Sequence, residues 1–136
     1  MRHRRRALAT VEMGFLALLL VVVLLGIVSV AGIVQVEMGL AAVAEEAARA
    51  AAMAPSVALV QERGQNRGAA VGAGYALRNG SLSVTVDASR FAPGGRVRAI
   101  AAYRVTSADL PMLVAGTVDL DREHTEVVPR FRSLPP

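Results

Sequence analysis

A long run without any charged side chain, residues 13–36, constrains this chain more than any other feature. An α-helix rises 1.5 Å per residue, so about 20 apolar residues cross the hydrocarbon of a bilayer. The run is long enough, and Ser29 and Gln35 are its only distinctly polar side chains. A lone carboxylate, Glu12, stands just before it, where a charge at the edge of the hydrocarbon is costly. The sequence therefore predicts a membrane-spanning helix over residues 13–36.

The basic residues next to this run predict its orientation. Arg2, Arg4, Arg5 and Arg6 precede it, and no comparable cluster follows it. Cytoplasmic flanks of membrane spans carry an excess of basic residues. We expect a single-pass protein of the cytoplasmic membrane, with residues 1–7 as a basic cytoplasmic leader and the C-terminal part outside. The arginines would also contact anionic lipid head groups.

A cleaved signal peptide is the competing interpretation of the same segment. Ser29-Val30-Ala31 supplies the small residues that a signal peptidase needs. However, the apolar run continues through Ile33 and Val34, beyond a typical signal core, and Glu12 would interrupt its start. These observations favour a spanning helix, and the N-terminus of the mature protein distinguishes the two.

The helical pattern continues past the predicted span. Strong helix formers dominate as far as Pro55, and Glu45 and Arg49 have the favourable four-residue spacing of an ion pair. We expect one anchor helix over residues 8–54, because a residue before proline avoids the α conformation. Ser56 can cap a second helix within residues 55–78. That helix is weakened by Gly64, Gly68, Gly72 and Gly74.

The rest of the chain has the alternation of β-strands. Residues 81–86 place Leu82, Val84 and Val86 on one face and hydroxyls on the other. Residues 96–105 place Val97, Ala99, Ala101, Tyr103 and Val105 on one face, and residues 114–128 form a third strand with Val118 and Leu120 inward. The fold class is α+β, in which the two helices precede a small antiparallel three-stranded sheet over residues 79–128. We expect residues 129–136 to form a loosely ordered tail.

Composition excludes several kinds of chemistry. There is no cysteine, so disulfides and thiolate catalysis are absent. The net charge of +4 comes from the leader, because the eleven arginines beyond it nearly balance ten carboxylates. With aromatic residues at 4%, this balance gives no sign of nucleic-acid binding.

Motifs of catalysis or metal binding are also missing from the sequence. His3 and His124 have no partner at metal or base spacing, and we expect His124 to be a plain solvent-facing residue. Gly72-x-Gly74 lacks the strand that precedes a phosphate loop. A carboxylate run near one strand indicates a solvated sheet face rather than a calcium loop; it contains Asp119, Asp121, Glu123 and Glu126. We expect no enzymatic activity, no cofactor, no metal and no small-molecule substrate.

The N-terminal segment has the pattern of a type IV pilin. A small residue, Ala7, is the last of the basic leader, and Glu12 is the fifth residue after it, just before the apolar helix. The stretch Arg6-Ala7-Leu8-Ala9-Thr10-Val11-Glu12 resembles the TadE-like family, which comprises minor pseudopilins of tight-adherence (Flp-type) pilus systems. Two positions depart from the common pattern, because Ala7 stands where Gly is commoner and Met13 where Phe is common. The Ala-rich residues 41–52 and the β region also fit.

The resemblance carries expectations beyond those of composition and spacing. It implies cleavage between Ala7 and Leu8 by a prepilin peptidase, with Glu12 acting in recognition between subunits. It implies a minor or accessory role in pilus assembly, with other pilins and the pilus platform proteins as partners. Two interpretations stay beside it, an anchored external domain that binds an envelope partner and a domain secreted after Ala31. Glu12 also has a plain interpretation, an interfacial carboxylate favoured near a helix N-terminus.

Overall fold

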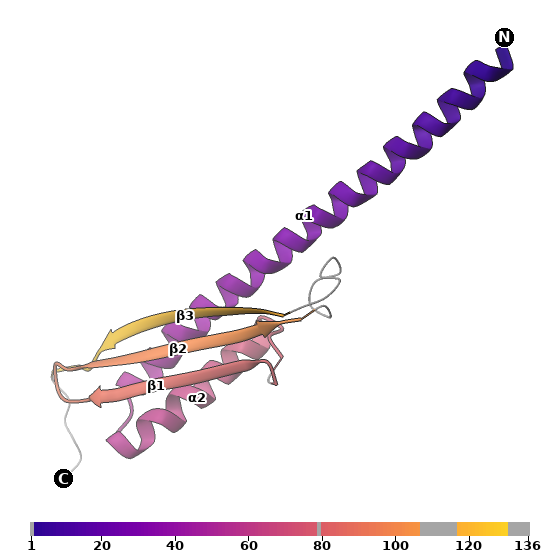
Figure 1. Ribbon diagram of the computed structural model, residues 1–136. Coiled ribbons are helices and arrows are strands. Elements are labelled where there is room, and N and C mark those ends of the chain that lie inside the picture. Colours follow the sequence, from indigo (N-terminus) through magenta and orange to yellow (C-terminus); the bar gives the residue numbers. More distant parts are fainter. Residues whose placement is uncertain (1, 79, 107–116, 131–136) are drawn as a thin grey trace.

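One helix extends far beyond a small two-layer head (Figure 1). The computed structural model describes residues 2–78, 80–106 and 117–130, with side chains described from Val11 onward. Its elements are helices α1 (Arg2–Ala52) and α2 (Val57–Gly74) and strands β1 (Leu82–Arg90), β2 (Arg96–Val105) and β3 (Val118–Val127). The predicted α+β class, with a long apolar helix, a second helix and an antiparallel three-stranded sheet, is confirmed.

Helix α1 is continuous from the leader into the head. At 1.5 Å per residue its 51 residues span about 76 Å. It begins at Arg2 rather than near residue 8, so the arginine-rich leader is part of the helix. The predicted pair within it forms, with Arg49 Nη2 2.8 Å from Glu45 Oε1.

Helix α2 is shorter than the sequence predicts. Ser56 occupies its N-cap position, but the Ser56 side chain makes no capping hydrogen bond. The helix ends in a Schellman-type turn, in which the Leu77 and Ala76 amides donate to the carbonyls of Gly72 and Ala73. Ala76 takes the left-handed conformation of this turn, with φ of 58°. Glycine usually occupies such a position, so the sequence offered no clear stop signal there.

The sheet has the order β1-β2-β3, with both pairings antiparallel. Every second residue of strand β2 is buried along its whole length. These buried residues are the predicted ones: Val97, Ala99, Ala101, Tyr103 and Val105. This helix-covered face of the sheet packs on both helices. Val86 is buried on β1, whereas Leu82 and Val84 are half-buried. Val118 lies on the inward face as predicted, because it pairs with the buried Val105, but it remains 41% exposed at the strand end.

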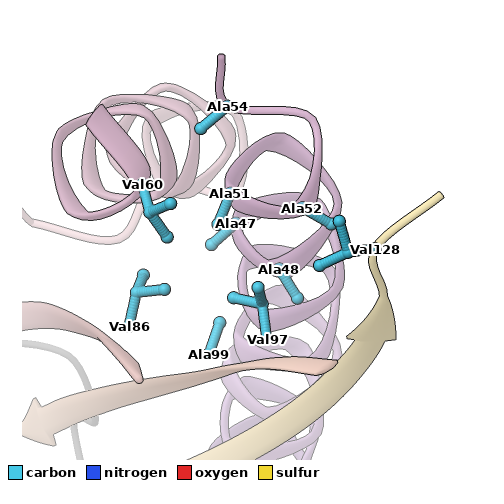
Figure 2. Packing of buried hydrophobic residues seen from close by; sticks show 10 residues of the cluster. All are labelled: Ala47, Ala48, Ala51, Ala52, Ala54, Val60, Val86, Val97, Ala99 and Val128. Atoms are coloured by element: carbon cyan, nitrogen blue, oxygen red, sulfur yellow. The ribbon is translucent and has the colours of Figure 1, made fainter. Parts of the chain in front are cut away.

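Small residues let the two layers approach closely (Figure 2). One cluster joins five alanines near the end of α1 to valines of α2 and the sheet; it contains Ala47, Ala48, Ala51, Ala52, Ala54, Val60, Val86, Val97, Ala99 and Val128. A second cluster lies nearer the N-terminal part of α1 and joins Leu40 and Val43 to Tyr103 and Val105. The two clusters form a continuous layer along α1 beneath the sheet.

The glycines of α2 belong to this packing. Gly64, Gly68 and Gly72 are buried and lie one helical turn apart. A Cβ atom on Gly64 would lie 2.6 Å from Val86 Cγ2, and one on Gly72 would lie 2.5 Å from Leu82 Cδ2. These residues therefore allow β1 to rest directly on the α2 backbone. The prediction that they only weaken the helix missed this function.

Candidate membrane span and N-terminal segment

The first half of α1 is apolar and bare. Every residue from Val11 to Leu25 is exposed, although leucine and valine dominate this stretch. A core helix of a soluble protein has similar length and composition, but it is buried, whereas none of the most apolar part of α1 is buried. Exposed apolar surface on this scale requires a cover of lipid or of other helices. The helix is long and apolar enough to cross a membrane.

The polar groups inside this stretch suit an apolar environment. The Ser29 hydroxyl donates to the Leu25 carbonyl at 2.9 Å, so it is satisfied within its own helix. Backbone amides inside a helix are likewise paired, which is the main requirement of a membrane span. Gln35 is exposed and lies at the end of the stretch next to the head. No polar group of the span therefore needs a partner outside α1 except Gln35, which lies near its edge.

Glu12 lies on the bare part of α1. Its side chain is exposed between Val11 and Met13, which are 72% and 70% exposed. Within the residues that the structure describes, Glu12 makes no ion pair or hydrogen bond through its carboxylate. The carboxylate is therefore placed next to the apolar surface and accessible to a partner from outside the chain.

The other predicted N-terminal site residues are placed by their backbone alone. Ala7 and Leu8 lie on consecutive positions of α1, and the helix is continuous through the peptide bond between them. The arginines of the leader occupy the first turns of the same helix; they are Arg2, Arg4, Arg5 and Arg6.

The boundary between span and head is marked by an ion pair. Glu37 is the first charged residue after the apolar run, and its Oε1 atom lies 2.9 Å from Arg122 Nη2 on β3. Ile33 and Val36, just before it, pack against the cluster that contains Val105. The head therefore begins at the end of the uncharged run. Sequence alone could not pair these residues, because Arg122 is distant in the chain.

Strand β3 separates its polar residues onto two faces. Asp119, Asp121 and Glu123 lie opposite Arg104, Ala102 and Ile100 of β2, on the face away from the helices. Glu126 lies on the helix-covered face opposite Val97, so a single carboxylate face is wrong. His124 is half-buried on that same face, with Nε2 3.4 Å from Glu126 Oε2, and is therefore not simply solvent-facing.

Several charged side chains of the head form ion pairs or hydrogen bonds with neighbouring residues. Arg104 Nε donates to Asp119 Oδ1 at 2.9 Å, which raises the pKa of Arg104. Arg98 pairs with Glu123. A hydrogen bond from the Ser89 backbone amide lowers the pKa of Asp87. In the described part of the chain no three acidic or histidine side chains are grouped to hold a metal ion.

The chain matches no protein-family model, no curated protein and no solved structure. Any family assignment consequently rests on the resemblance of the N-terminal segment and on the physical character of α1 and the head.

Proposed function

We propose that this protein is a TadE-like minor pseudopilin that assists the assembly of an Flp-type pilus. The observation that carries the proposal is the division of α1 into a bare apolar half and a half that forms the core of a small head. The bare half can be held by lipid before assembly and by the helices of neighbouring subunits afterwards. Both environments satisfy the same apolar surface, so transfer between them needs no refolding of the head.

The N-terminal residues support the same function. Glu12 stands exposed at the end of the apolar surface, at the position that the pilin pattern reserves for an acidic residue. The arginines before it would keep the N-terminus in the cytoplasm until the leader is removed. The head would then face the outside of the cytoplasmic membrane. The partners would be other pilins, the prepilin peptidase and the platform proteins.

The N-terminus of the mature protein tests this proposal directly. We expect N-terminal sequencing of protein extracted from membranes to begin at Leu8. A start at Met1 or Arg2 would instead indicate an anchored external domain. A start at Gly32 would indicate a secreted domain, and either outcome would contradict the proposed processing.

A variant at the cleavage site sharpens the test. Ala7→Arg should keep the leader attached, because a bulky charged residue replaces the small side chain that the peptidase would accept. Arg4→Ala is a matched control that changes the leader without changing the cleavage position, and it should be processed. If Ala7→Arg is processed as the parent is, cleavage does not occur at residue 7.

A further inference from the structure

The face of the sheet away from the helices, here called the open face, carries opposite charges at its two ends. A hollow of about 350 Å³ lies at one end. Three arginines and one carboxylate line it, together with two hydroxyl residues; they are Asp87, Ser89, Arg90, Arg96, Arg98 and Thr125. A hollow of about 460 Å³ lies at the other end, where the charged side chains are Asp119, Asp121 and Arg104. We call these the basic end and the acidic end.

The two ends lie at different heights along α1. The basic end adjoins Val97, which packs on the alanines at the C-terminal end of α1. The acidic end adjoins Tyr103 and Val105, which pack in the cluster that Ile33 and Val36 of α1 contact. Figure 1 shows the C-terminal end of β2 toward the bare half of α1 and its N-terminal end away from it. The acidic end is therefore close to the bare apolar half of α1, and the basic end is far from it.

The basic end has charge that the head itself does not neutralise. Arg90 and Arg96 are direct cross-strand partners, next to an irregularity in the pairing of β1 and β2. Like charges placed opposite each other on a sheet are destabilising. Asp87 lies near Arg90 and Arg98, and Glu123 pairs with Arg98. Arg96 makes no ion pair within the described residues.

The acidic end has an excess of negative charge. Arg104 pairs with Asp119, so this end has one arginine for two carboxylates and only one of them is paired. Asp121 forms no ion pair within the part of the chain that is described, although its backbone carbonyl accepts a hydrogen bond from Arg122. Ala102 lies beside Asp121 in the same row of the sheet and Ser83 lies beyond Ala102, and their small side chains leave the hollow open. A long arginine side chain from outside could reach Asp121 there.

We propose that the basic end of one copy binds the acidic end of a second copy of this chain. Arg96, with Arg90, would pair with Asp121 of the second copy, and each pairing would neutralise charge that the isolated head leaves unpaired. An anionic polymer would use the basic end alone and leave the acidic end unexplained. The residues lining the basic end include no aromatic side chain on which nucleic-acid bases could stack.

The separation of the two ends determines how the copies are offset. Their centres lie about six residues apart along β2, which is about 20 Å at the spacing of a β-strand. Two copies with parallel α1 helices at the same height, whose open faces meet, place basic end against basic end, and they repel. For such parallel copies, contact requires one copy to be displaced by about 20 Å along the direction of α1. Such a head-to-tail contact leaves one end free on each copy and can propagate.

The contact itself rests on the charges of the sheet, and only its direction relative to a membrane rests on the proposed function. A displacement of this size cannot occur between copies whose spans lie at one depth in one bilayer. It suits a copy that has moved outward from the membrane into an assembly. Its acidic end would then meet the basic end of the next copy still below it.

Co-purification of two differently tagged full-length copies from detergent tests the contact. The basic-end variant is Arg90→Glu with Arg96→Glu, and the acidic-end variant is Asp119→Lys with Asp121→Lys. Asp121→Lys alone is a milder variant that disrupts no ion pair within the head. The control variants, Arg63→Glu and Glu62→Lys, change exposed charges on α2 outside both ends.

Parent copies should co-purify at low salt and separate at about 1 M salt, where the screening length falls to about 3 Å. Each end variant should lose self-association by at least about tenfold, because like charges then meet. A mixture of basic-end and acidic-end variants should recover binding to within about threefold of the parent, since each supplies the end that the other lacks. The α2 variants should behave like the parent.

The proposal is overturned if parent copies do not associate at low salt or if the end variants associate normally. Failure of the mixture to recover binding would also overturn it, because recovery separates charge pairing from misfolding. Binding of polyphosphate to parent protein whose copies do not associate would assign the basic end to an external polyanion instead. N-terminal sequencing of the same preparation is independent of all these outcomes, so failure of this contact and failure of the pseudopilin proposal remain distinguishable.

Discussion

Glycine at three positions of α2 decides how closely the helix approaches the sheet. At Gly64 an added Cβ would meet both Val86 Cγ2 at 2.6 Å and the Ala47 carbonyl oxygen at 3.3 Å. The second of these neighbours is backbone of α1, which cannot turn away as a side chain can. Gly74, by contrast, has nothing within 4 Å of an added Cβ. The same residue type therefore has different roles within one helix.

Gly64→Val should destabilise the head by about 1–3 kcal/mol, the usual cost of overpacking a close-packed interface. Thermal unfolding of the full chain in detergent measures this through near-UV circular dichroism of Tyr103, which is buried in the head. Gly74→Ala is the matched control and should leave the unfolding temperature unchanged or slightly raised. Equal unfolding temperatures for Gly64→Val and the parent would show that the helix can move away from β1 without cost.

The proposed function assigns its most specific role to Glu12. After cleavage, the chain would begin with the free amine of Leu8, one helical turn before the Glu12 carboxylate. At the edge of the hydrocarbon an unpaired charge is costly, so each group favours a partner of opposite charge. We expect Glu12 of one subunit to pair with the Leu8 amine of a neighbouring pilin and thereby to set their axial register.

Glu12→Gln should insert and fold normally, because Glu12 makes no contact with the head, yet it should fail to join its pilin partners. Loss of one member of a partly buried pair can cost about 3–5 kcal/mol, enough to abolish a weak contact. Co-purification with partner pilins and counting of pili on cells measure the effect. Parental levels of both would mean that Glu12 is only an interfacial carboxylate.

At the scale of elements, α1 and α2 are joined by a small charge cluster as well as by apolar packing. Glu46 Oε2 accepts a hydrogen bond from Arg67 Nη2 of α2 at 2.8 Å, and Glu46 Oε1 accepts one from Arg49 Nη1 at 2.9 Å. The hydrogen bond from Arg67 is the main reason that the pKa of Glu46 is lowered, and the charge of Arg49 adds to it. One carboxylate thus connects the two helices on their exposed side.

The lowered pKa of Glu46 predicts the direction of a pH effect. A carboxylate whose pKa is lowered by folding stabilises the folded state above its unfolded pKa, and this contribution disappears as the pH falls through the folded pKa. Glu46→Gln should therefore unfold at a lower temperature than the parent at pH 7, and the difference should shrink below about pH 4.

The effect of Glu46→Gln should be small, up to about 1 kcal/mol, since the pairs are largely exposed. Tyr103 near-UV circular dichroism between pH 7 and pH 3 measures it. Glu62→Gln is the control, because Glu62 makes no ion pair within the described residues. A difference between Glu46→Gln and the parent that is constant across this pH range would show that packing, and not charge, connects the helices here.

At the scale of the whole molecule, local patterns predicted the elements and long-range contacts decided the rest. The uncharged run and the alternation of residues 96–105 were sufficient for the bare helix and the central strand, because both signals lie within one element. The role of Gly64 was not accessible in this way, since its contact, Val86, lies on a strand beyond the end of α2. The opposite charges of the open face likewise emerge only when the strand register places Arg90 opposite Arg96 and Asp121 opposite Ala102.

The orientation of the whole molecule in the membrane is simple to test, because the chain has no cysteine and a single one can be introduced. The arginine cluster before the span predicts that the head lies outside the cytoplasmic membrane. Asn66 is an exposed position of α2 outside both charged ends, so Asn66→Cys should react with a membrane-impermeant maleimide added to cells whose outer barrier, if they have one, has been opened. His3→Cys, in the leader, should react only after the cytoplasmic membrane is also permeabilised and only in protein that keeps its leader. Labelling of His3→Cys but not of Asn66→Cys in cells with an intact cytoplasmic membrane would reverse the topology. It would also remove the basis for placing the head in a pilus.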